Sequence, residues 1–123
     1  MTSTQFFRVT AGIEIGAGLA LIVAPALVIS LLFGPSEIQT AVAIGRLAGA
    51  ALVSLGAACW WARHDGGSAA SRGLVNGLLI YNLAVVALVL SGSFGSLSST
   101  LWAPVVVHGA MAIWCVLLSR VGR

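Results

Sequence analysis

The sequence predicts an all-α fold: an integral membrane four-helix bundle, up-down-up-down, with both termini cytoplasmic. Hydrophobic residues make up 59% of the 123-residue chain and charged residues only 7%, whereas about a quarter of the residues of soluble proteins are charged. Four apolar segments each have about the 20 residues that a helix needs to cross a hydrocarbon core of about 30 Å. Arginines gather at one end of these segments. We expect residues 1–123 to form a single transmembrane domain.

The four predicted spans are about 8–33, 40–63, 71–92 and 100–119. They are expected to be helices because an open sheet in lipid leaves backbone groups without hydrogen bonds. The breaks between them are rich in Gly, Pro, Ser and Asp, which end helices and cap the next ones. Each connection is short, so neighbouring helices should be antiparallel. Pro25 lies inside the first span, which we expect to be kinked there.

The arginines predict the orientation. Short loops that are rich in basic residues stay in the cytoplasm, and five of the six basic residues fall on one side of the predicted spans: Arg8, Arg63, Arg72, Arg120 and Arg123. The loops on the other side carry only Glu37. This bias predicts cytoplasmic termini in a multi-pass protein. The use of arginine without lysine, beside Ala- and Gly-rich segments, is typical of a GC-rich bacterial genome, so we expect a bacterial inner membrane.

A net charge of +3 does not predict nucleic-acid binding, because the arginines are dispersed and form no basic patch. The expected surroundings are the lipid bilayer, further copies of the chain, or the subunits of a larger membrane complex. Cys59 and Cys115 both fall in apolar segments, where we expect reduced, buried thiols.

Six polar side chains interrupt the predicted spans. At 1.5 Å of rise per residue, their depths form layers. Glu14 and Asn76 lie about 8–9 Å from the inner boundary. Near the middle lie Tyr81, Asn82 and His108. Arg46 lies about 7 Å from the outer boundary.

Small residues accompany the two charged ones. The helical stripe through Glu14 contains Thr10, Ala11, Ala17, Gly18, Leu21, Ala24 and Pro25, and the stripe through Arg46 contains Ala43, Gly49, Ala50, Val53, Gly56 and Ala57. Small residues let membrane helices approach closely, so both charges are expected to face other helices. Three spans also contain Gly-x-x-x-Gly pairs, which predict helix packing: Gly12 and Gly16, Gly45 and Gly49, and Gly73 and Gly77.

Two interpretations of each charge stay open. Glu14 is either a neutral, hydrogen-bonded carboxyl that joins the first helix to Asn76 of the third, or a site that binds protons or cations. Desolvation disfavours its carboxylate form unless a cation is near. Arg46 either extends to the outer headgroups or serves as an internal counter-charge. An ion pair between them is not expected, because their predicted depths differ by about 14 Å.

His108 has Met111 and Cys115 on its helical face, at i+3 and i+7. A haem or metal site would need a second strong ligand, and His64 falls in a loop at the inner side. A symmetric dimer could bring two copies of His108 together. We nevertheless expect no cofactor, and a hydrogen bond from His108 to Asn82 or Tyr81 instead.

Two family resemblances are visible. The stretches "FRVTAGIEIGAGLALIVAP" and "GRLAGAALVSLGAACWWAR" resemble the first two helices of small four-helix bacterial membrane proteins of the DoxX-like kind. That resemblance implies a compact four-helix protein, and some relatives act as membrane partners of redox systems. A glutamate within the first helix also resembles the small multidrug resistance transporters. The aromatic and glycine motifs of their third and fourth helices are missing here, and their dual-topology members lack this arginine bias.

The sequence contains no nucleophile–base pair, phosphate-binding loop or paired carboxylates. The prediction is therefore a non-enzymatic membrane protein that associates with itself or serves as an accessory subunit of a membrane complex. The alternative is a small proton-coupled transporter or channel that uses Glu14.

Overall fold

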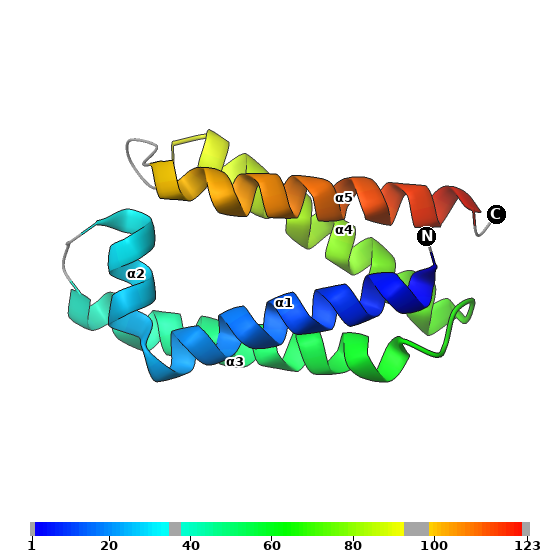
Figure 1. Cartoon of the computed structure of the whole chain (residues 1–123), viewed down its shortest axis with the longest axis horizontal. Coiled ribbons are helices and arrows are strands. Elements are labelled where there is room, and N and C mark those ends of the chain that lie inside the picture. Colours follow the sequence, from blue (N-terminus) through cyan, green and yellow to red (C-terminus); the bar gives the residue numbers. More distant parts are fainter. Residues whose placement is uncertain (1, 35–37, 93–98, 122–123) are drawn as a thin grey trace. The chain divides into compact units, whose positions relative to one another are not determined.

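A computed structural model describes residues 2–34, 38–92 and 99–121, and these residues are helical throughout apart from short turns (Figure 1). The elements are α1 (Ser3–Val23), α2 (Pro25–Phe33), α3 (Ile38–Ala62), α4 (Ala69–Leu90), the 3-10 helix η1 (Ser99–Leu101) and α5 (Trp102–Val121). The predicted all-α class is confirmed for this part of the chain. Backbone contacts group the chain into a first unit, Met1–Asp65, and a second unit, Gly66–Arg123. Whether both belong to one domain stays a prediction.

Among the residues that the structure describes, four helices are long and apolar enough to cross a membrane. They cover Ser3–Val23, Thr40–Ala62, Ala69–Leu90 and Ser99–Arg120. The last three agree with the predicted spans within about two residues. The first begins five residues earlier than predicted and ends ten residues earlier.

The early end of the first span has its cause in Pro25. The sequence predicts one kinked helix, but the chain leaves the helical conformation at Ala24 (φ −132°, ψ 54°), and Pro25 is the first residue of a separate helix, α2. Proline has no N–H to donate and excludes the preceding residue from the α conformation. Figure 1 shows α2 running at a steep angle to α1. The predicted kink is therefore a complete break.

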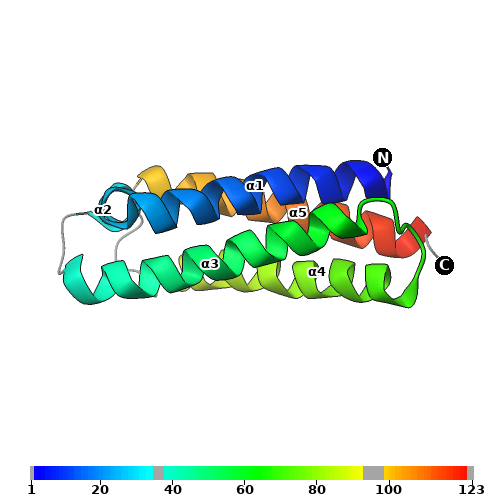
Figure 2. The ribbon, with the colours of Figure 1, turned by 90° about the horizontal axis from the view of Figure 1, so that it is seen from below.

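In the first unit, α1 and α3 are antiparallel and lie side by side (Figures 1 and 2). A Cβ built on Gly49 would lie 2.6 Å from the carbonyl oxygen of Gly18, and one built on Gly56 would lie 3.1 Å from that of Ala11. The two backbones thus approach each other directly at two levels. α2 contacts α3 nearer to the start of α3, where Ile29 lies against Gly45.

In the second unit, α4 and α5 form another antiparallel pair. The side chain of Asn82 on α4 contacts that of His108 on α5. Apolar residues of the same two helices are also buried: Val75, Leu78 and Val89 on α4, and Met111, Ala112 and Cys115 on α5.

Side-chain caps fix where α1 and α4 begin. Thr2 accepts a hydrogen bond from the backbone N–H of Gln5 (3.3 Å), and the Gln5 side chain accepts one from the Thr2 N–H (3.1 Å). This reciprocal pair is a capping box. Ser68 caps α4 by accepting from the Ser71 N–H at 3.0 Å. These caps explain why α1 begins before the apolar run, at Ser3.

Candidate functional site

The middle polar layer of the second unit is built from α4 and α5. His108 Nδ1 lies 2.8 Å from Asn82 Oδ1, and the Asn82 amide Nδ2 donates to the Leu78 carbonyl oxygen at 2.7 Å. The rings of Tyr81 and His108 meet edge to face, with centroids 5.3 Å apart. The predicted association of these three side chains is confirmed.

This geometry defines the tautomer of His108. Asn82 uses its NH₂ group toward a carbonyl, so its Oδ1 is the atom that faces the imidazole and must accept. His108 Nδ1 therefore carries the hydrogen, and in a neutral ring Nε2 keeps its lone pair. Asn82 is only 2% exposed, so the hydrogen bond is shielded and holds α4 to α5.

A histidine that is oriented through Nδ1 has the arrangement found in many metal sites. In the part of the chain that the structure describes, however, no three His, Cys, Asp or Glu side chains come together. Cys59 and Cys115 are both buried, as expected, and form no disulfide with each other. The absence of a haem or metal cofactor stays a prediction.

Glu14 lies in the middle of α1 and is buried, with 4% of its surface exposed. Thr10, one turn earlier, is also buried, and its hydroxyl donates to the Phe6 carbonyl oxygen at 2.9 Å. Gly12 and Gly16 lie on the exposed side of the same helix. The helix therefore presents two different faces with small residues, one buried and one exposed.

Asn76 lies on α4 and is exposed. Its expected hydrogen bond with Glu14 would join the second unit to the first, and it stays a prediction. The role of Glu14, structural or proton-binding, likewise depends on groups beyond its own helix.

Within the first unit, Arg46 does not share the buried face of α3. The sequence predicts that it faces other helices together with Gly49, but Arg46 is exposed, whereas Gly45 and Gly49 are buried. The closest approach of two helices selects residues without a Cβ, and each residue turns the helix by about 100°. The glycines therefore define the contact face of α3, and Arg46 lies beside it. Whether it extends toward the headgroups or serves as an internal counter-charge stays a prediction.

The glycine pairs divide into two groups. Gly45 and Gly49 pack tightly within the first unit, whereas a Cβ on the other four would meet nothing within 4 Å: Gly12, Gly16, Gly73 and Gly77. Gly18 and Gly56 form close contacts, although neither belongs to the Gly-x-x-x-Gly pairs named as packing residues. The sequence signal for them lies in the two small-residue stripes. The stripe through Glu14 contains Gly18, and the stripe through Arg46 contains Gly56.

Arginines lie at one end of each antiparallel pair. In the first unit, Arg8 is near the start of α1 and Arg63 follows the end of α3, where its guanidinium lies 4.0 Å from the Trp60 ring centroid and donates to the Trp60 carbonyl. In the second unit, Arg72 is near the start of α4 and Arg120 is in the last turn of α5. Arg123 and Glu37 lie outside the described residues.

Comparison of the chain with protein-family models, with curated proteins and with solved structures finds no match. The DoxX-like resemblance is therefore neither supported nor opposed by these comparisons.

Proposed function

We propose that this chain is a multi-pass protein of a bacterial inner membrane, with no enzymatic activity of its own, that acts by helix–helix association within the bilayer. Its partner is another copy or the subunits of a larger membrane complex. The observation that carries this proposal is the pair of open glycine faces, Gly12 and Gly16 on α1 and Gly73 and Gly77 on α4.

The physical argument rests on how helices associate in lipid. Hydrophobic exclusion from water is not available there, so close packing of small residues provides much of the attraction. Glycine also weakens a helix by about 1 kcal/mol relative to alanine in water. At these four positions a Cβ would meet nothing within 4 Å, so close contacts within either unit do not require their small size. A surface on which another helix packs would explain why these four residues are small.

The remaining exposed surface supports a lipid environment. Large apolar side chains are prominently exposed on α1 and α3, including Val23 (78%), Leu47 (74%) and Trp61 (77%). Such exposure over several turns is typical of membrane-spanning helices and marks interaction surfaces in other proteins.

Native mass spectrometry of the gently solubilised protein tests the association. We expect an oligomer or a stable complex in the wild type, and dissociation in Gly16→Leu and Gly77→Leu. Ala48→Leu is the matched control, because Ala48 is an exposed small residue of α3. A wild-type monomer, or an oligomer that both glycine variants leave unchanged, would contradict the proposal.

Reporter fusions at each terminus test the orientation. The arginines at one end of each helix pair support cytoplasmic termini, so a cytoplasmic reporter should be active at both ends. A periplasmic signal from either terminus, or mixed signals, would reject this orientation and favour a dual-topology protein.

A second candidate function is proton-coupled transport, and the burial of Glu14 favours it specifically. An ionisable group inside a membrane helix is costly and commonly marks a transport path. The test is proton release in liposomes on addition of cationic substrates. Glu14→Gln keeps the side-chain shape and hydrogen-bonding capacity but cannot carry a proton. A signal in the wild type that the variant loses would establish transport, and silence in both would favour association.

A further inference from the structure

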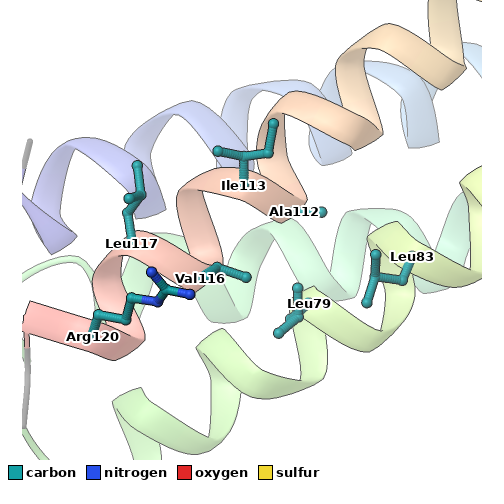
Figure 3. Close-up of a pocket in the computed structure, with 7 residues that line it drawn as sticks. All are labelled: Leu79, Leu83, Ala112, Ile113, Val116, Leu117 and Arg120. Carbon is teal, nitrogen blue, oxygen red and sulfur yellow. The ribbon is translucent and has the colours of Figure 1, made fainter.

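A groove runs along the α4–α5 pair in the second unit (Figure 3). Its volume is about 290 Å³, and six apolar side chains line it: Leu79 and Leu83 from α4, and Ala112, Ile113, Val116 and Leu117 from α5. Ala112 is buried, whereas Leu83, Ile113 and Leu117 are at least half exposed. The groove is therefore open to its surroundings along apolar walls.

One end of this groove is positively charged. Arg120, the seventh lining residue, lies in the last turn of α5, and Figure 3 shows its guanidinium directed back along the helix toward Val116. Because α5 is antiparallel to α4, this turn lies level with the first turn of α4. Arg72 is exposed there, and the amino end of a helix carries a partial positive charge.

We propose that this groove binds an anionic phospholipid, with the headgroup phosphate at Arg120 and one acyl chain along the apolar walls. The proposal rests on the membrane location proposed above. Arg120 is the last residue of the apolar span Ser99–Arg120, which places its side chain at headgroup depth. From Arg120 to Ala112 the groove follows α5 for about 12 Å toward the middle of the membrane.

The order of chemical groups identifies the occupant. A phospholipid has a charged phosphate followed directly by an apolar chain, and the groove has a guanidinium followed directly by leucine, isoleucine and valine side chains. Basic residues between membrane helices are a known basis for binding anionic headgroups. A zwitterionic lipid adds a positive group that opposes Arg120, and a free phosphate has no chain for the groove.

Native mass spectrometry of the full-length protein with lipids added in detergent tests this site. Phosphatidylglycerol and phosphatidylcholine with identical acyl chains are compared. We expect about a fivefold preference for phosphatidylglycerol, equivalent to the roughly 1 kcal/mol of one basic residue near an anionic surface. Arg120→Gln should abolish the preference. Arg8→Gln, which removes an exposed arginine of the first unit, should keep it. Excess inorganic phosphate should not displace the lipid.

Three results would overturn the proposal: equal retention of both lipids by the wild type, an unchanged preference in Arg120→Gln, or displacement by inorganic phosphate. Circular dichroism confirms that both variants are folded, which is expected because both arginines are exposed. The proposed membrane location is tested separately. Recovery of the protein in the soluble fraction without detergent would contradict it.

Discussion

The two helix pairs are held together in different ways. In the first unit, α1 and α3 meet through glycines, and the Gly18 and Gly49 backbones leave no room for a side chain between them. In the second unit, α4 and α5 meet through side chains, with the partly buried Asn82–His108 hydrogen bond at the middle. A Cβ built on Gly73, Gly77 or Gly109 of that unit would meet no atom within 4 Å.

This difference shows two solutions to one physical problem. Where the surroundings are as apolar as the side chains, burial alone does not favour one helix arrangement over another. Close backbone contact solves the problem through dispersion forces, which require tight shape matching. A hydrogen bond between the helices favours one arrangement because it is directional. Its donor and acceptor meet in only one register of the two helices. The first pair should therefore be sensitive to added volume, and the second to lost polarity.

The largest expected effect is that of Gly49→Leu. Its Cβ would lie 2.6 Å from the Gly18 carbonyl oxygen, and backbone cannot move aside as a flexible side chain can. We expect the free energy of unfolding to fall by about 3 kcal/mol, the upper range for overpacking. Unfolding in increasing SDS, followed by circular dichroism, measures this change.

Ala48→Leu is the control for that variant. Ala48 is the preceding residue and is exposed, so the same side chain should be tolerated there within about 0.5 kcal/mol. If both leucines were tolerated equally, close glycine packing would not be what holds the first unit together.

A smaller effect is expected for Asn82→Leu. This change removes the side chain that is hydrogen-bonded to His108 and keeps an apolar volume in the interface. Hydrogen bonds between membrane helices contribute about 0.6 kcal/mol on average and up to about 1.7 kcal/mol, and the unfolding free energy should fall within that range.

A double-mutant cycle with His108→Phe isolates the contact. Each single variant breaks the same hydrogen bond, so the double variant should lose less than the sum of the two. Strictly additive losses would show that Asn82 and His108 act independently and that the second unit is held by its apolar residues.

The smallest effects are expected from alanine at glycine positions, which compare the two units directly. In the dissociated chain, the added Cβ of Gly77→Ala meets nothing within 4 Å and should stabilise α4 by up to about 1 kcal/mol through helix propensity. Gly56→Ala would place its Cβ 2.7 Å from Ile15 Cγ1 and 3.0 Å from the Ile15 nitrogen, and should destabilise by about 1 kcal/mol. Chemical unfolding of both variants measures these changes, and the same sign in both would remove the contrast between the units.

Hydropathy alone predicts the helices, because a span must be continuous and apolar over about 20 residues. Depth counting predicts the His108–Asn82 contact, since antiparallel helices with short connections bring equal depths together. The sequence does not predict the exposure of Arg46 or the open faces of Gly12 and Gly73. Those depend on which of several small-residue stripes is chosen, and neighbouring stripes differ by only one residue.

The same limit applies to the end of the first span. Pro25 indicates a disturbance, but a proline can kink a membrane helix or end it. Ala24 leaves the helical conformation, and α2 then packs against α3 through Ile29. That contact is a tertiary one and has no counterpart in the local sequence pattern.

The break at Pro25 also sets how well the helices match one another in length. α1, α4 and α5 have 21, 22 and 20 residues, which correspond to about 30 to 33 Å each. A continuous helix over residues 3–33 would measure about 46 Å. Such a helix would create a hydrophobic mismatch of more than 10 Å, which a bilayer relieves through tilt or local thickening. By ending at Val23, α1 comes close in length to α4 and α5, a length that would suit a membrane of ordinary thickness.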